Sequence, residues 1–112
     1  MTAEPESFDN VWTDLQRRLR PRQVVHNWTR LKGPYGDDFI VLEIRTDSLS
    51  VESPGAKRLV RVHRRDFEVV WAVWRKYLAG KVHRKDLTLL TRCSKYVISM
   101  LHWREISTEG AA

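Results

Sequence analysis

Residues 39–62 read FIVLEIRTDSLSVESPGAKRLVRV, and this stretch decides the fold. Apolar and polar side chains alternate in three runs, and the turn-forming pairs Thr46-Asp47 and Pro54-Gly55 separate them. Alternation with a period of two predicts β-strands, because successive side chains of a strand point to opposite faces. Runs joined by such short turns predict an antiparallel meander. The expected strands cover residues 39–45, 48–53 and 57–62.

A fourth strand is expected just upstream of this stretch. Residues 23–30 are rich in Val, Trp and Thr, and the segment Gly33-Pro34-Tyr35-Gly36 that follows has the composition of a turn. Within 48–53, the alternation predicts that Leu49 and Val51 face inward. We therefore expect a sheet of four antiparallel strands.

The residues before the sheet have a helical period. Apolar side chains recur three and four positions apart over about residues 7–20 and form one face. Ser7 is a suitable N-cap, and Pro21 ends the segment. We expect this helix to dock on the sheet through its apolar face, which consists of Phe8, Val11, Trp12, Leu15 and Leu19.

Helical periodicity returns after the sheet. One long helix is expected, with an apolar stripe made of Phe67, Val70, Trp71, Trp74 and Leu78 and a left-handed stop at Gly80. A short helix over about 84–91, a break at 92–94 and a last helix over about 95–105, capped by Ser94, complete the chain. The prediction is therefore one α+β domain over residues 1–112, with flexible tails over about 1–6 and 107–112.

Charge is the first indication of function. The chain has a net charge of +6, and residues 57–112 alone carry 13 Lys and Arg against 5 Asp and Glu, a net +8. Such an excess is typical of proteins that bind a polyanion such as nucleic acid. A solvated surface, an acidic protein partner and a membrane surface are the alternatives. A single cysteine, no secretory leader and no apolar run long enough to cross a bilayer favour a cytoplasmic protein without a membrane partner.

Residues 84–103 resemble a helix-turn-helix DNA-binding motif. Leu87, Cys93, Ile98 and Leu101 stand where the motif has core residues, and Ser94 stands at the start of its second helix. The chain departs from the motif at Arg92, where glycine is usual, and at Thr88, where alanine is usual. The second helix is also apolar on several faces, which is equally typical of a helix buried against a sheet or a second subunit.

The resemblance implies duplex DNA as the partner, bound by a homodimer. A narrow polar stripe on the last helix and the residue before it would face base edges. Basic residues on the last strand and the neighbouring helices would contact phosphates, although charged residues also protect an edge strand from aggregation. The expected base-facing residues are Arg92, Lys95, Ser99 and His102. The expected phosphate contacts are Arg58, Arg61, Arg65, Arg84 and Lys85.

Two other functions fit the same sequence. A protein that binds single-stranded nucleic acid or RNA would stack bases on aromatic side chains such as Trp28 and Tyr35. A purely structural protein would dimerise through its apolar last helix and show no affinity for nucleic acid. Whether those aromatic side chains are exposed distinguishes the first alternative from groove reading.

Catalytic motifs are weak, and we expect neither an enzyme nor a bound metal or cofactor. Asp38, Glu43 and Arg45 faintly resemble a metal-dependent nuclease site, but the two acids share one short strand. The four histidines lack metal-binding spacing, and the five glycines form no phosphate-binding loop. Basic neighbours could activate Cys93, but a small core residue is the more ordinary role for it.

Overall fold

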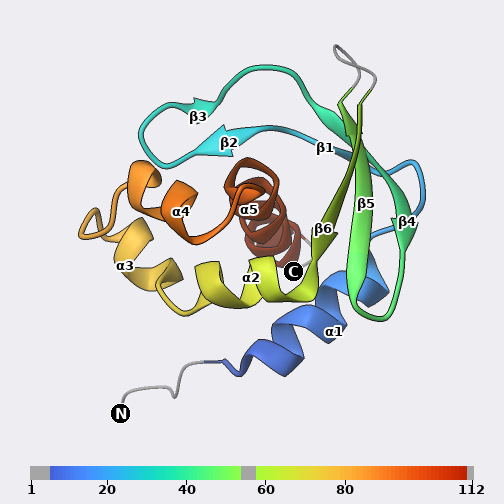
Figure 1. The fold of residues 1–112 in the computed structure, drawn as a ribbon, viewed down its shortest axis with the longest axis horizontal. Helices are drawn as coiled ribbons and strands as arrows, with labels where there is room; N and C mark the ends of the chain where they lie inside the picture. Colours follow the sequence, from blue (N-terminus) through green and yellow to red (C-terminus); the bar gives the residue numbers. More distant parts are fainter. Residues whose placement is uncertain (1–5, 54–57, 111–112) are drawn as a thin grey trace.

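A computed structural model describes residues 6–53 and 58–110 of the chain. Its largest element is a four-stranded antiparallel sheet in the order β1-β4-β5-β6 (Figure 1). The predicted meander and the α+β class are therefore confirmed. The turn predicted at Pro54-Gly55 lies outside the described residues. The strands are β1 (Val24–Val25), β4 (Phe39–Ile44), β5 (Ser48–Ser53) and β6 (Arg58–His63).

The inner face of the sheet is lined by small apolar side chains in register. Val51 of β5 pairs with Val41 of β4 on one side and with Val60 of β6 on the other. Leu49 and Val51 are fully buried, as the alternation predicts. The register shifts between Val41 and Glu43, which is the irregularity of a β-bulge.

Residues 26–36 differ from the prediction. The expected strand over 23–30 is two strands, because the chain leaves the sheet after β1 and forms a separate hairpin of β2 (Trp28–Thr29) and β3 (Gly33–Pro34). The turn lies at residues 30–32, so the predicted turn at Gly33–Gly36 is wrong by a few positions. Gly33 and Gly36 have φ of 65° and 77°. Residues with a side chain rarely adopt these angles, so the backbone conformation accounts for glycine at both positions although no tight turn lies there.

Helix α1 (Phe8–Arg18) begins where it was predicted to, but its buried apolar face packs mainly against the helix that follows the sheet and only at one end on the sheet itself. The Ser7 hydroxyl accepts a hydrogen bond from the backbone N–H of Asn10 at 3.3 Å and so caps the helix. The Trp12 ring lies 5.3 Å from the ring of Phe67, and its indole N–H donates to the carbonyl of Thr46 between β4 and β5. The helix therefore joins the lower end of the sheet to α2 (Arg64–Trp71) (Figure 1).

The expected long helix is interrupted at residues 72–73 and forms α2 and α3 (Trp74–Leu78). The interruption turns Tyr77 inward beside the buried Trp74, whereas an unbroken helix would bury Leu78, which is exposed. Burying the Tyr77 ring removes more apolar surface from water than burying Leu78 would. Gly80 has φ of 79° and ends α3 in the left-handed conformation, as predicted.

Helices α4 (Arg84–Leu90) and α5 (Ser94–Gly110) complete the fold. Helix α5 runs through the centre, between the sheet, the hairpin and the other helices (Figure 1). Val97, Ile98, Met100 and Leu101 are buried within this single chain, so the apolar faces that suggested a dimer are already covered. The helix extends past Glu105, where its end was expected. None of the helices in residues 6–53 and 58–110 has the length and apolar character needed to cross a bilayer.

Candidate nucleic-acid interface

The turn between α4 and α5 is fixed by Thr91. Its hydroxyl accepts a hydrogen bond from the N–H of Cys93 at 3.0 Å and donates to the carboxylate of Asp66 in α2 at 2.7 Å. The Cys93 carbonyl then accepts hydrogen bonds from the N–H groups of Tyr96 and Val97 in the first turn of α5. Ser94 is already the first residue of that helix. Cys93 therefore occupies the capping position predicted for Ser94.

The pKa of the Cys93 thiol is raised above its ordinary value. Burial raises its pKa, the Asp66 carboxylate raises it further, and the hydrogen bond with Thr91 opposes these effects without cancelling them. The sulfur lies 3.9 Å from the carbonyl oxygen of Arg61, so the turn sits against β6. Cys93 is therefore a packing residue and not an activated nucleophile.

Two residues of the predicted base-facing stripe are covered by β2. Ser99 is only 1% exposed, and its hydroxyl accepts a hydrogen bond from the Trp28 N–H and lies 3.0 Å from the Lys95 carbonyl. The His102 ring stacks on the Trp28 ring with 3.8 Å between centroids and 3° between planes. The Ser99 side chain therefore cannot reach a DNA base, and the face of α5 that it shares with His102 is occupied by the hairpin.

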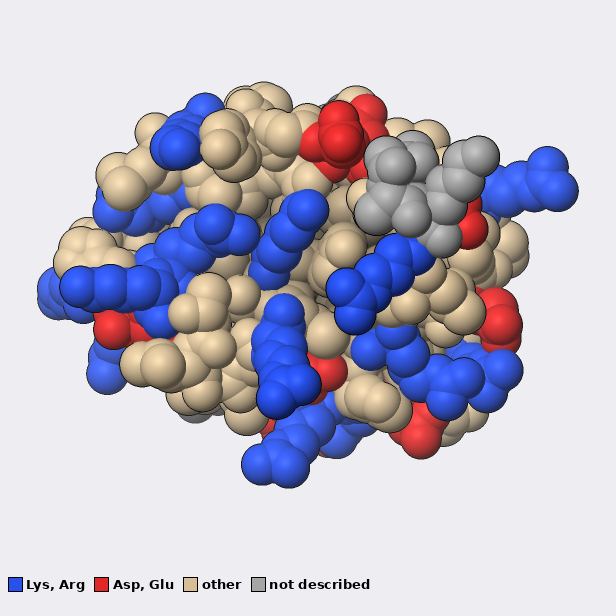
Figure 2. Space-filling view, turned by 45° about the horizontal axis from the view of Figure 1, so that its top comes forward, with Lys and Arg blue, Asp and Glu red and all other residues tan. Residues whose placement is uncertain are grey.

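The other seven predicted residues are exposed. Lys95 and Arg92 flank the start of α5, while the rest lie on β6, α2 and α4. Lys32 of the hairpin, which the sequence analysis omitted, is exposed among them. Figure 2, in which the side of the molecule with the hairpin is turned forward, shows Lys and Arg side chains spread across the face in view. We define the basic belt as Lys32, Arg58, Arg61, Arg65, Arg84, Lys85, Arg92 and Lys95.

Tertiary contacts bring the belt together. The contact of Cys93 with Arg61 holds the α4–α5 turn beside β6, and the Thr91–Asp66 hydrogen bond holds it beside the residue that follows Arg65. At the other end, Arg84 and Lys95 line one pocket of about 130 Å³ with Tyr35. The belt residues Lys32, Arg84 and Lys95 therefore lie around two adjoining pockets, and the turn that carries Arg92 lies beside the backbone of Arg61. Arg58 lies three positions before Arg61 on the same strand and so points to the other face of the sheet.

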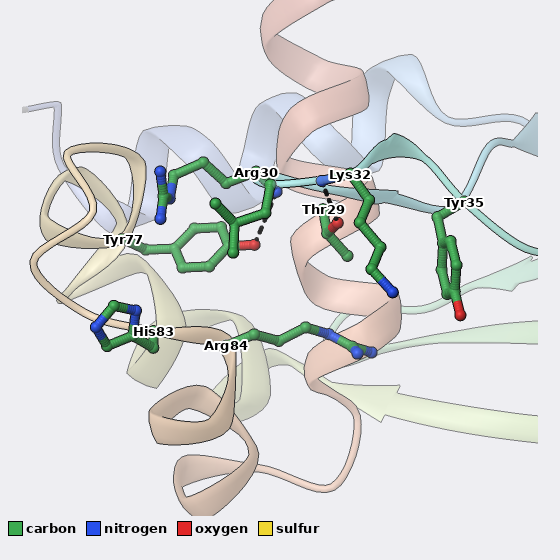
Figure 3. A pocket seen from close by; sticks show the side chains of 8 residues that line it. Thr29, Arg30, Lys32, Tyr35, Tyr77, His83 and Arg84 are labelled. Carbon is green, nitrogen blue, oxygen red and sulfur yellow. Dashed lines mark hydrogen bonds between the residues drawn. The ribbon is translucent and has the colours of Figure 1, made fainter.

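A second pocket of about 190 Å³ lies between the hairpin and α4, and we name it the hairpin pocket. It shares Thr29, Tyr35 and Arg84 with the first pocket, and neither is lined by Asp or Glu. In Figure 3, the Lys32 and Arg84 side chains converge at the end where the Tyr35 ring stands. The hairpin pocket is lined by Thr29, Arg30, Leu31, Lys32, Tyr35, Tyr77, His83 and Arg84.

Tyr35 is the exposed aromatic side chain of this surface. Its ring is 54% exposed, and the Lys32 ammonium lies 4.3 Å from the ring centroid. Its backbone N–H donates to the carbonyl of Asn27 at 2.9 Å, and the buried Asn27 side chain in turn donates to the carbonyl of Asp37. The ring is therefore held on an anchored backbone, exposed to solvent and with the Lys32 ammonium over one of its faces.

The cations around Tyr35 have no internal counter-charge. Among residues 6–53 and 58–110, neither Lys32 nor Arg84 nor Lys95 forms an ion pair. Like charges that converge without a carboxylate raise the local potential and attract an anion. The sequence carried only a weak signal for this site, because Lys32 lies in the half of the chain with a net charge of −2.

The structure gives no support to the weak resemblance to a nuclease site. Asp38 lies 2.8 Å from Nδ1 of His26, and Glu43 accepts from Nε of Arg45 at 2.9 Å, so each acid is engaged by a different neighbour. No cluster of three or more metal-binding side chains occurs in the part of the chain that the structure describes. Comparison with protein-family models, curated proteins and solved structures finds no match.

Proposed function

We propose that this protein binds single-stranded nucleic acid along the basic belt. The observation that carries the proposal is the exposed Tyr35 ring beside Lys32, Arg84 and Lys95, in two adjoining pockets lined by no carboxylate. Single strands are bound by this combination, because every base has a face that stacks and every nucleotide has a phosphate.

The belt supports binding of more than one nucleotide. Beyond Lys95, the exposed Arg92 belongs to the α4–α5 turn, which contacts the backbone of the exposed Arg61 on β6. Phosphate contacts of this kind supply affinity without sequence preference and make it depend on salt. We therefore expect weak sequence selectivity for both DNA and RNA.

Groove reading of a duplex by α5 is less well supported. The hairpin covers Ser99 and stacks on His102, so α5 offers Lys95 alone from the predicted stripe. A single strand also requires no symmetric pair of half-sites, so the proposal holds for a monomer. No catalytic step is part of the proposal.

The test is an anisotropy titration with labelled strands of about 12 nucleotides, within the usual span of one such surface. Single-stranded DNA, RNA and the matching duplex are compared at about 50 and 200 mM salt, the range over which phosphate contacts weaken strongly. We expect tighter binding of the single strands and a loss of affinity at the higher salt. Tighter binding of the duplex would favour the groove-reading alternative, and no binding at low salt would overturn the proposal.

Tyr35 provides the sharper test. Stacking of a base is worth about 1–3 kcal/mol, so Tyr35→Ala should weaken single-strand binding by roughly 5- to 150-fold. Tyr35→Phe keeps the ring and should bind within about twofold of the wild type. Equal loss in both variants, or in neither, would contradict the stacking role.

A further inference from the structure

The hairpin pocket holds one arginine that lies apart from the basic belt. The half-buried Arg30 donates its backbone N–H to the hydroxyl of Tyr77 at 3.0 Å. If Gly80 carried a Cβ atom, three atoms of the Arg30 guanidinium would each lie 3.5 Å from it. Because the three distances are equal, the planar group lies flat over that glycine. The missing side chain of Gly80 gives the guanidinium a flat surface against which it is positioned.

This positioned charge has no counter-charge. Arg30 forms no ion pair within the described residues 6–53 and 58–110, and the walls beside it include the Tyr77 ring and Leu31. A guanidinium is poorly compensated next to apolar walls, because they supply no hydrogen-bond acceptors. An anion with several oxygens would satisfy it, and planar guanidinium groups match phosphate through paired hydrogen bonds.

The size and shape of the hairpin pocket limit which part of a ligand can enter it. The pocket volume of about 190 Å³ is below the roughly 300–1,000 Å³ of sites that enclose a whole drug-sized ligand. Arg30 lies against Gly80 at the end away from Tyr35, while the Tyr35 end adjoins the neighbouring pocket. Figure 3 shows Arg30 and His83 at one end and Lys32, Tyr35 and the head of Arg84 at the other. The small volume admits only part of a strand, which favours its end over its interior.

From this geometry we propose that the hairpin pocket binds the terminal phosphate monoester of a single strand whose neighbouring base stacks on Tyr35. The inference rests on the proposed function and names the part of the ligand that this end of the site recognises. A monoester carries a charge of about −1.5 to −2 at pH 7, more than the single charge of an internal phosphodiester. Arg30 supplies the paired hydrogen bonds for this terminal group, and Lys32 and Arg84 at the Tyr35 end attract the rest of the strand.

The experiment compares three labelled strands of one sequence, about 12 nucleotides long. One ends in a 5′-phosphate, one in a 3′-phosphate, and one has hydroxyl groups at both ends, with the label kept internal. We expect one phosphorylated strand to bind about tenfold more tightly than the hydroxyl strand, since a charge-assisted hydrogen bond is worth about that factor. The phosphate position that gains affinity identifies the strand polarity.

Arg30→Gln should remove this preference, so that the phosphorylated and hydroxyl strands bind with equal affinity. The matched control is Arg17→Gln, which removes an equal charge from exposed Arg17 on α1, and it should keep the full preference. Equal binding of all three strands by the wild type would overturn the inference while leaving the proposed function intact. A preference that survives in Arg30→Gln with an unchanged unfolding midpoint would overturn the role of Arg30.

A second test uses the wild-type protein alone, so its result does not depend on whether a variant folds. Amide resonances are followed while adenosine 5′-monophosphate or adenosine is added. Shifts at Arg30, Leu31 and His83 with the monophosphate and not with the nucleoside are expected. Absence of those shifts would overturn the terminal-phosphate site. If no strand binds at all, the proposed function fails, and this measurement then tests by itself whether the pocket binds a phosphate monoester.

Discussion

Two surfaces of this molecule carry arginines beside a hollow, and they differ in how the charge is balanced. Beside α1, Arg104 donates to Asp14 and to Glu6 at 2.6 Å each, and Arg18 donates to Asp14 at 3.1 Å. These groups line an open groove of about 560 Å³. The hairpin pocket is smaller, at about 190 Å³, yet its cations have no carboxylate among its lining residues.

The pKa of Arg104 reflects this balance. Burial of its guanidinium lowers the pKa, but hydrogen bonds and charge attraction from Glu6 and Asp14 outweigh burial and raise it above the ordinary value. The protein itself therefore supplies the negative charge and the hydrogen-bond acceptors that the Arg104 guanidinium needs. The two hollows therefore differ in what they offer an anion: in the larger one the protein's own carboxylates already pair with the arginines, whereas no carboxylate lines the hairpin pocket.

The largest expected effect comes from the core beneath the α1 surface. Trp12→Ala should reduce the free energy of unfolding by about 3–5 kcal/mol, because the buried ring contacts Phe67 and leaves a cavity when removed. Urea denaturation measures this change. Tyr35→Ala, at the exposed surface, should alter stability by no more than about 0.5 kcal/mol. A similar loss in both variants would break the division between a structural and a binding surface.

Next in size is the loss of a balanced charge. Asp14→Asn should destabilise the fold by about 1–3 kcal/mol, since Arg104 is only 12% exposed and loses a charged hydrogen-bond partner. Arg84→Gln should leave the unfolding midpoint within the range of ordinary surface changes, because Arg84 forms no ion pair among residues 6–53 and 58–110 that could be lost. Strong destabilisation by Arg84→Gln would show that its charge serves the fold.

A smaller effect concerns the salt dependence of binding. Lys95→Gln should reduce the slope of log affinity against log salt by about 0.7 for a single strand, the value of one phosphate contact. Arg17→Gln, on α1, should leave the slope unchanged. Anisotropy titrations over a salt series give both slopes. If both variants change the slope equally, the effect is one of net charge and not of the basic belt.

The smallest effect concerns the thiol between the two surfaces. Burial and Asp66 raise the pKa of Cys93, so a smaller fraction is thiolate at pH 8 than for an unperturbed cysteine. Alkylation by iodoacetamide should therefore be slower than that of free cysteine, and it should accelerate as the pH rises. Mass spectrometry over time follows the reaction. A rate above that of free cysteine would indicate an activated thiol and contradict its packing role.

Local patterns in the sequence were sufficient for most of the fold. The alternation in 39–62 predicted three strands, and the spacing of Val11, Trp12 and Leu15 predicted α1, because each pattern needs only a neighbouring core to face. The break after Trp71 was not predicted, since it depends on the room available to the Tyr77 ring. The chain also gave no local sign that residues 26–36 would leave the sheet.

The candidate site was predicted only in part for the same reason. Arg84 and Lys95 were identified from charge, and Tyr35 was named as a stacking candidate. Ser99 was expected at the surface because its cover, β2, lies 71 residues earlier in the chain. Arg30 and Lys32 were missed because nearby acids such as Asp37 mask them in a charge count. Their importance depends on α4 lying opposite them, which only the tertiary structure reveals.

The central position of α5 has a consequence for the order of folding. The N–H of Trp28 reaches Ser99 across 71 residues, and Arg18 reaches the Arg104 carbonyl across 86. Contacts this distant in the chain close late, because a long loop must be ordered before they form. A nascent chain that has not yet reached Ser94 leaves the inner face of its sheet, with Phe39 and Val41, open to water. Until α5 arrives, that face is a surface for chaperone binding or for aggregation.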